Sequence, residues 1–161
     1  LFRPERPSAE PRRNGEDGLF LCWRVRQGVF QDNVLEGNRR FGISIGHKDS
    51  DNLFRRNQIR SNHEAGVCFR DETRAMAAHR NRLEENIIED NGVEKEAPGI
   101  RVRGQTRDIE LRGNVIRDTR REGERKQVVG VLIEEDAGPV VLENNVIEAK
   151  TRIEDRRNPS R

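Results

Sequence analysis

The sequence contains an internal repeat, which restricts the fold more than any other feature. Five segments each open with a glycine followed by alternating apolar residues, as in Gly-Leu-Phe-Leu and Gly-Ile-Ser-Ile. The first two segments begin 24 residues apart, and the later ones are longer because of insertions. The opening residues are Gly18, Gly42, Gly66, Gly99 and Gly130, and each segment later reaches an asparagine, at Asn33, Asn57, Asn86, Asn114 and Asn145.

The alternation after each glycine indicates short β-strands with one buried face. The sequence lacks the sustained 3.6-residue period of apolar residues that would indicate helices. A unit of 24 residues that holds three short strands and three turns closes one coil of a parallel β-helix. We therefore predict an all-β solenoid, a parallel β-helix of about five coils over residues 18–155. First strands are expected at residues 19–23, 43–47, 67–71, 100–103 and 131–134, and the inward residues of the second strands are expected to be Phe30, Phe54, Leu83, Leu111 and Leu142.

The asparagine of each repeat has a structural explanation. Stacked coils lie about 4.8 Å apart, so equivalent residues fall above one another. An inward asparagine at a bend can hydrogen-bond to backbone groups of its own coil and of the neighbouring coil, which would otherwise be buried without partners. We expect the five asparagines to form a ladder.

The composition fits a narrow core. The chain is 37% charged and 32% hydrophobic, yet its 31 basic and 29 acidic residues leave a net charge of only +2, which argues against a self-repelling disordered chain. In a β-helix about two inward residues per strand line the core, and the charges are expected to form ladders on the outer faces. No apolar run approaches the roughly 20 residues of a transmembrane helix, so no membrane span is expected.

The two ends differ from the repeats. Residues 1–17 are rich in Pro, Arg and Glu and are expected to be either part of an earlier coil or disordered, and residues 156–161 are expected to be a disordered tail. The chain starts at Leu1 and shows no signal-peptide pattern. We therefore expect a fragment of a longer β-helix, with the remaining coils of the parent chain as partners.

The Gly-apolar-x-apolar and Asn-x-Ile elements resemble the right-handed parallel β-helix proteins of the pectate-lyase-like superfamily, over about Gly18 to Ile153. Residues 41–52 are similar to uncharacterised bacterial members. The resemblance implies a right-handed solenoid, a carbohydrate-active protein with a polysaccharide partner, and a secreted or periplasmic location. The superfamily includes lyases, hydrolases and epimerases, so no set of catalytic residues is carried over.

Candidate functional residues gather at the ends of the first strands. A solenoid presents function on the outward side chains of one sheet and on the adjoining turns. In the first strands one outward column is expected to contain Phe20, Ser44, Cys68, Arg101 and Leu132. The polar candidates in the outward columns and in the turns just beyond them form one cluster: Trp23, Arg24, His47, Lys48, Asp49, Asp51, Arg70, Asp71, Glu72, His79, Arg101 and Arg103.

Uronate elimination is one chemistry that this cluster suggests. It needs a cation to neutralise the sugar carboxylate and a base to remove the adjacent carbon-bound proton. Arg70, Arg101, Arg103 or Lys48 would supply the cation, and His47 or Lys48 the base.

Two other chemistries use the acidic residues. A glycoside hydrolase needs two carboxylates about 5 to 5.5 Å or about 6.5 to 9.5 Å apart, and Asp49 with Asp71, or Asp51 with Glu72, are the candidate pairs. Calcium is a candidate cofactor, with Asp49, Asp51 and Asp71 as oxygen ligands.

Each of these residues also has a structural interpretation. In so charged a chain, a solvated face of mixed salt bridges is the ordinary expectation for any turn. His47 ends an apolar strand, where a hydrogen-bonded structural histidine is common, and His79 lies in an insertion. Trp23 either stacks on a sugar ring or packs beneath a preceding coil.

Nucleic acid is not an expected partner. The arginine runs at 117–125 and 152–161 are interleaved with acids and lack aromatic residues for base stacking. Cys22 and Cys68 are predicted to be free thiols, because they fall in different columns about 10 Å apart by the coil spacing.

The function that the sequence favours is binding of an extended acidic polysaccharide along the first-strand groove between Arg24 and Arg103. Whether the chain also cleaves it stays open, with lyase-type elimination as the leading enzymatic form and glycoside hydrolysis as the other. We predict His47, Lys48, Asp49 and Asp71 as catalytic residues. The predicted substrate-binding residues are Trp23, Arg24, Arg70, Glu72, His79, Arg101 and Arg103. The alternative is a non-catalytic structural or glycan-binding module. An enzyme is expected to have its polar cluster pointing into one concave groove, whereas in a non-catalytic module these side chains are expected to splay outward over a flat face.

Overall fold

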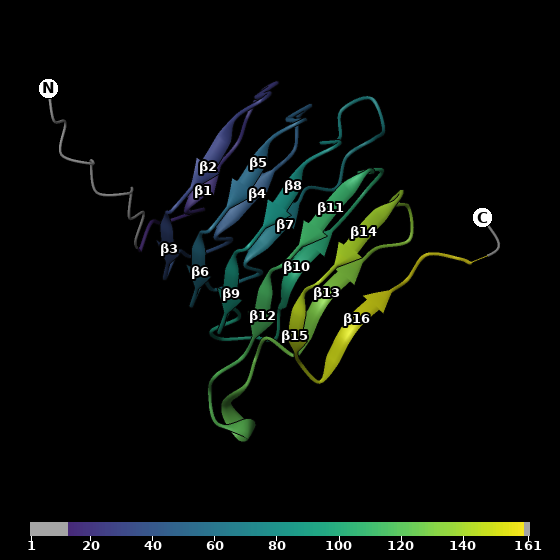
Figure 1. Cartoon of the computed structure of the whole chain (residues 1–161). Coiled ribbons are helices and arrows are strands. Elements are labelled where there is room, and N and C mark those ends of the chain that lie inside the picture. The colour runs from purple at the N-terminus through teal and green to yellow at the C-terminus, as the bar shows by residue number, and fades with distance from the viewer. Residues whose placement is uncertain (1–12, 160–161) are drawn as a thin grey trace, which may run out of the picture.

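The computed structural model describes residues 13–159, which form a parallel β-helix. Three parallel sheets run along the solenoid, and each coil contributes one short strand to each sheet. Figure 1 shows the coils stacked in chain order from the purple N-terminal end to the yellow C-terminal end. The prediction of an all-β solenoid of about five coils is confirmed.

The first sheet contains six parallel strands, one more than the number of repeats. It carries the pattern that opens each repeat, and its register aligns equivalent residues, for example Ile43 with Val67 and Val67 with Ile100. Its strands are β1 (Leu19–Phe20), β4 (Ile43–Ile45), β7 (Val67–Phe69), β10 (Pro98–Val102), β13 (Val129–Ile133) and β16 (Thr151–Asp155).

The second and third sheets contain five parallel strands each. The second sheet consists of β2 (Val29–Gln31), β5 (Leu53–Arg55), β8 (Arg82–Glu84), β11 (Ile109–Arg112) and β14 (Val140–Glu143). The third consists of β3 (Val34–Glu36), β6 (Gln58–Arg60), β9 (Ile87–Glu89), β12 (Val115–Arg117) and β15 (Val146–Glu148).

The core is a column of stacked apolar side chains between the three sheets. Phe54, Leu83 and Leu111 are fully buried as predicted, whereas Phe30 and Leu142, near the two ends, are half-buried. Phe30 and Phe54 stack with ring centroids 5.1 Å apart. The glycine that opens each repeat lets adjacent coils and the core approach closely: a Cβ on Gly66 would lie 2.8 Å from the carbonyl oxygen of Gly99.

The predicted asparagine ladder is present. The Oδ1 atom of Asn86 accepts hydrogen bonds from the backbone N–H and Nδ2 of Asn57, each at 3.0 Å. The Nδ2 atom of Asn86 donates to the carbonyl oxygen of Phe54 at 2.9 Å and to Oδ1 of Asn114 at 3.0 Å. The same contacts continue from Asn33 to Asn145.

Two further polar ladders were not predicted. One runs at the corner after the third sheet, where Asn38, Asn62 and Asn91 are joined side chain to side chain and Asn91 donates to Oε1 of Gln127. The other lies before the second sheet, where the backbone N–H of Asn52 donates to Oδ1 of Asn81. Every corner of the coil therefore uses buried amides to satisfy backbone groups.

The chain ends continue the coil pattern in part. Within the leading segment, the backbone N–H of Asn14 donates to Oδ1 of Asn38, and Asp17 accepts from the backbone N–H of Phe41. At the other end, the backbone N–H of Arg156 donates to the carbonyl oxygen of Ile133. Residues 1–12 and 160–161, which carry the rest of these predictions, lie outside the described residues.

Insertions change the turns and leave the strands in register. The protruding turn between β12 and β13 contains a 3-10 helix, η1 (Glu122–Glu124), visible below the third sheet in Figure 1. Between residues 13 and 159, the structure contains no helix of the length and apolar character needed to cross a membrane.

Candidate functional site

The turn that follows β4 sets the geometry of the candidate site. His47 and Lys48 both adopt positive φ angles, of 47° and 65°. Two successive left-handed residues redirect the chain, so the inward-outward alternation of the strand does not continue into the turn. As a result, the side chain of His47, which alternation along β4 would bury, is partly exposed like that of Lys48, whereas that of Asp49 points inward.

His47 is the centre of a polar network that joins three successive coils. Its Nε2 lies 3.3 Å from Oε1 of Glu72, and its backbone N–H donates to Oε2 of Glu72 at 2.6 Å. Its Nδ1 lies 2.9 Å from Nη2 of Arg70 and 3.7 Å from Sγ of Cys22. Because a guanidinium only donates, Nδ1 is the accepting nitrogen and the ring proton is on Nε2, facing Glu72.

Arg70 closes the outer face of the first sheet at this position. It donates to Oγ of Ser44 at 2.9 Å and to the carbonyl oxygen of Leu21 at 2.8 Å, and its guanidinium lies 4.5 Å from the ring centroid of Phe20. Its side chain is only 14% exposed. Arg70 is therefore held in place by groups on the two preceding coils.

The predicted outward column needs a correction. Ser44, Cys68 and Leu132 have the outward parity, yet all three are buried. Arg70 covers Ser44, and Cys68 packs in a separate small cluster with Phe41 and Ala65. Long or apolar neighbours thus bury positions that alternation alone places in solvent. Both cysteines are free, as predicted, with Cys22 exposed.

Trp23 presents an aromatic surface next to His47. The indole is half exposed, and its ring centroid lies 5.9 Å from that of His47. The guanidinium carbon of Arg24 lies 5.5 Å from the Trp23 ring centroid, and Nζ of Lys48 lies 5.7 Å from it. No carboxylate within residues 13–159 pairs with either cation. The exposed ring and its two cations therefore form one surface, which we call the Trp23 platform.

Asp49 does not face this surface. It is fully buried, where its carboxylate accepts hydrogen bonds from the backbone N–H of Val25 at 2.8 Å and of Gly46 at 3.3 Å. Burial raises the pKa of Asp49 above its usual range, and these two hydrogen bonds together with Arg70 partly offset the rise. The carboxylate of Asp49, predicted to be catalytic, therefore holds the turn and does not face the exposed surface of the cluster.

The other predicted acids lie apart. Asp51 forms a two-point hydrogen bond with the exposed side chain of Arg80, and Oδ2 of Asp71 lies 3.8 Å from Nη2 of Arg103. Asp49, Asp51 and Asp71 thus have different partners. Across the described part of the chain, no three His, Cys, Asp or Glu side chains are grouped so that they could hold a metal ion, so the predicted calcium ligands do not converge.

The remaining predicted residues are engaged elsewhere. Glu134 accepts from Nε of Arg101 at 2.8 Å and of Arg103 at 3.4 Å, so one acid partly neutralises both cations. His79 contacts the carbonyl oxygen of Arg74 through Nε2 at 2.8 Å. Neither group joins the His47 network.

A shallow hollow lies beside the cluster. Its volume is about 270 Å³, and it is lined by Asp71, Glu72, Thr73, Gly104, Gln105 and Asp136. Three of these are acids, so the hollow repels anions. The predicted catalytic residues therefore do not share one concave groove, since Asp71 lines the hollow and Asp49 is buried.

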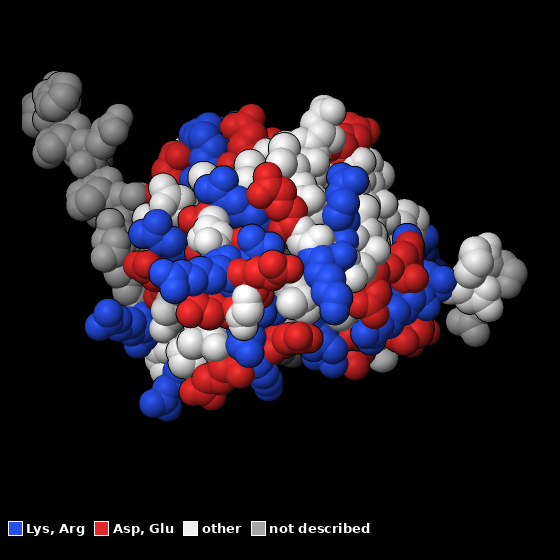
Figure 2. All heavy atoms as spheres, turned by 90° about the horizontal axis from the view of Figure 1, so that it is seen from below, with Lys and Arg blue, Asp and Glu red and all other residues white. Residues whose placement is uncertain are grey.

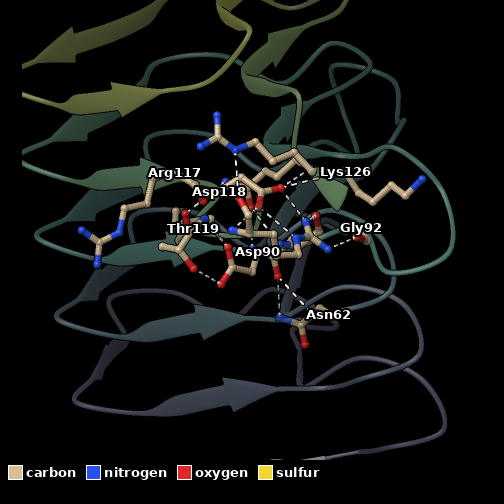
Figure 3. A network of polar contacts seen from close by, with 12 residues as sticks. Asn62, Asp90, Gly92, Arg117, Asp118, Thr119 and Lys126 are labelled. Atoms are coloured by element: carbon tan, nitrogen blue, oxygen red, sulfur yellow. Dashed lines mark hydrogen bonds and ion pairs between the residues drawn. The ribbon is translucent and has the colours of Figure 1, made fainter. Parts of the chain in front are cut away.

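A second polar network lies at the far corner of the coils (Figure 3). Asp118 forms a close ion pair with Arg120 at 2.6 Å and accepts from the backbone N–H groups of Lys126 and Gln127. Burial raises the pKa of Asp118, but the hydrogen bonds outweigh it and hold the pKa far below the usual range. Sequence reasoning missed this network, because Asp118 lies outside the repeat columns. It anchors the η1 turn.

Charges on the outer faces form the expected ladders. Glu36 pairs with Arg60 on the next coil, and Glu89 with Arg117, at 3.1 and 2.9 Å. Figure 2 shows acidic and basic side chains interleaved over one face. The near balance of charges thus reflects pairing between neighbouring coils.

The chain belongs to the family of right-handed β-helix proteins. The model of the family described as "Right handed beta helix region" matches residues 12–153, and this settles the predicted handedness. Among solved structures, the chain is similar to the A-module of the mannuronan C-5 epimerase AlgE4 from Azotobacter vinelandii, with a TM-score of 0.58 and 15% identity.

That similarity covers 89% of this chain and 38% of the epimerase module, so the chain spans well under half the length of the module. At this identity it shows the fold alone. No curated protein sequence matches the chain.

Proposed function

We propose that the chain binds an acidic polysaccharide at the Trp23 platform. The observation that carries the proposal is the half-exposed Trp23 ring, flanked by Arg24 and Lys48. An exposed aromatic ring stacks on the apolar face of a sugar, and cations without internal partners are available for a carboxylate or a sulfate.

The surrounding charges favour binding of the polysaccharide at the N-terminal end of the first sheet, rather than along the whole predicted groove from Arg24 to Arg103. Arg101 and Arg103 share Glu134, and the hollow beyond Glu72 is acidic. A polyanion would therefore make its best contacts over the first two coils. The solved module that this chain resembles is a mannuronan epimerase, so mannuronan is the first ligand to test.

Binding is favoured over elimination. A lyase base must reach a carbon-bound proton of the bound sugar, but Nδ1 of His47 faces Arg70 and the thiol of Cys22, and Nε2 faces Glu72. Lys48, which lies over the same ring as the proposed ligand, is the one predicted base that faces the platform. Elimination at this site would therefore depend on Lys48 and yield unsaturated sugar ends.

Trp23 itself reports on the proposal. The chain contains one Trp and no Tyr, so its fluorescence comes from the platform alone. Titration with mannuronan oligomers should change the emission with saturation, whereas neutral oligosaccharides should change it much less. Added salt should weaken binding, because exposed charges are screened.

Matched variants separate this site from general charge attraction. Arg24→Gln and Lys48→Gln should each weaken binding several-fold, whereas Lys150→Gln removes the same charge from an exposed position on the last coil and should have little effect. Equal weakening by all three would refute a specific platform. The same samples, with and without calcium, are assayed for unsaturated sugar ends. Their formation would show that the chain also cleaves the polysaccharide by elimination.

A further inference from the structure

Cys22 lies in an arrangement that polysaccharide binding does not explain. Its exposed thiol is 3.7 Å from Nδ1 of His47, whose Nε2 is 3.3 Å from Oε1 of Glu72. Glu72 is in turn fixed by the backbone N–H of His47, at 2.6 Å. A thiol, an imidazole and a carboxylate thus stand in line on three successive coils.

This geometry resembles that of an activated nucleophile. A base within reach of the thiol removes its proton, and a third group orients the base and stabilises the charge that it acquires. The ring proton on Nε2 faces Glu72, so Nδ1 is free of a proton and faces both Cys22 and Arg70. When Nδ1 takes the proton, Arg70 loses that acceptor but keeps Ser44 and the carbonyl oxygen of Leu21.

We propose that Cys22 is a nucleophilic thiol that exchanges with small anionic disulfides, with His47 as its base and Glu72 as the positioning residue. The proton of Cys22 moves to Nδ1 of His47, and the thiolate attacks one sulfur of the disulfide. A new S–S bond forms to Cys22, the original S–S bond breaks, and the proton on His47 passes to the leaving thiolate or, where that thiolate is a weak base, to water. The products are a mixed disulfide on Cys22 and one free thiol.

The preference for anions follows from the charges around the thiol. Arg24 and Lys48 flank the adjoining Trp23 ring, and Arg70 lies against His47. The charged groups that face His47 are Arg70 and Glu72, and Asp49 acts on it from beneath the turn. The exposed side is therefore cationic, whereas the acids lie on the inner side.

Cys68 supplies an internal control. It is 1% exposed, and burial raises the pKa of its thiol to about 11, partly offset by Arg103, Arg101 and Arg70. A disulfide reagent that attacks the folded protein should therefore modify Cys22 alone. Intact-mass and peptide mass spectrometry distinguish the two sites.

The test uses the dianionic aromatic disulfide 5,5′-dithiobis(2-nitrobenzoic acid), whose released thiolate is coloured. Reaction with the whole chain should release one equivalent of the coloured thiolate in a rapid phase. Cys22→Ser should abolish this rapid phase, and Cys68→Ser should preserve it. His47→Asn, in which asparagine tolerates the left-handed backbone of residue 47, should slow the phase about tenfold or more. Glu72→Gln should slow it by a smaller factor.

The pH dependence separates base catalysis from simple exposure. The rate advantage over His47→Asn should shrink as pH rises, because a free thiol ionises without the imidazole in alkaline solution. Because the aromatic reagent also has the better leaving thiolate, each disulfide is compared between proteins: in the Arg24→Gln, Lys48→Gln double variant the dianionic reagent should react more slowly than with the parent chain, and the dicationic disulfide cystamine faster.

Two results would overturn the proposal: reaction of Cys22 in His47→Asn at the parental rate throughout the pH range, or modification of Cys68 first. Unfolding curves of each variant show whether a slower reaction of Cys22 reflects loss of the fold. Glu72→Gln, a more conservative substitution, provides a second test of the same network. The outcome is independent of polysaccharide binding, since mannuronan titration of Cys22→Ser measures that function alone.

Discussion

Replacing a middle rung of the asparagine ladder should destabilise the solenoid far more than replacing its first rung. The side chain of Asn86 makes hydrogen bonds to Asn57, Phe54 and Asn114, with Asn57 donating through both its backbone N–H and Nδ2. Asn86→Ala would leave the backbone N–H of Asn57 and the carbonyl of Phe54 without these partners, in a site with no exposed surface.

The expected size follows from these two backbone groups. Each buried group left without a partner costs about 1–3 kcal/mol, so Asn86→Ala should lower the free energy of unfolding by about 4 kcal/mol. Asn33 donates to Asn57 through Nδ2, and no described residue donates to its side chain from a coil before it. Asn33→Ala should therefore cost only about 1 kcal/mol.

Urea unfolding followed by circular dichroism measures the difference. With a slope of about 2 kcal/mol per molar urea, the midpoint should fall by about 2 M for Asn86→Ala and by about 0.5 M for Asn33→Ala. Trp23 fluorescence adds a second probe, on the first coil. Equal midpoint shifts in the two variants, with unchanged slopes, would refute the idea that the ladder stabilises through shared buried contacts.

Two further predictions test close packing and buried charge. Gly66→Ala should destabilise the fold, because its Cβ would lie 2.8 Å from the carbonyl oxygen of Gly99, whereas Gly123→Ala, with nothing within 4 Å, should leave the melting temperature nearly unchanged. Asp118 has a lowered pKa in the fold, so the stability it contributes is complete above the unfolded pKa of about 4 and is lost as pH falls below it. Asp118→Asn should thus flatten the loss of stability in acid, measured by urea unfolding at several pH values, and a parallel loss in both proteins would contradict this.

The repeat predicts most of the fold because each coil repeats the same physical problem. Glycine lets neighbouring coils approach, alternating residues fill the core, and an amide satisfies each bend. The ladder of Asn38, Asn62 and Asn91 was overlooked although the first two are 24 residues apart, because the fourth rung is Gln127 and breaks the residue identity.

The candidate site was harder to predict, because it lies where the alternation ends. The left-handed residues His47 and Lys48 turn the imidazole of His47 toward solvent, so parity counted along β4, which places His47 inward with Ile43 and Ile45, gives the wrong side for that ring. Arg70 was correctly placed near His47, but its contacts with Ser44 and Phe20 depend on a long side chain folding back across coils. Cys22 was assigned to the sheet, and its proximity to His47 follows only from the stacking of the first two coils.

Charge pairing between coils gives the platform its significance. Where an acid on one coil meets a base on the next, as at Glu36 and Arg60, the pair satisfies itself and leaves little field for a ligand. Among residues 13–159 no acid pairs with Arg24 or Lys48, which instead lie over the half-exposed ring of Trp23. In a chain whose charges are mostly paired between coils, an anionic ligand is therefore attracted to cations that have no acidic partner and lie beside an aromatic ring. Arg101 and Arg103 are equally cationic, but both pair with Glu134. The Trp23 platform is for this reason the better binding candidate.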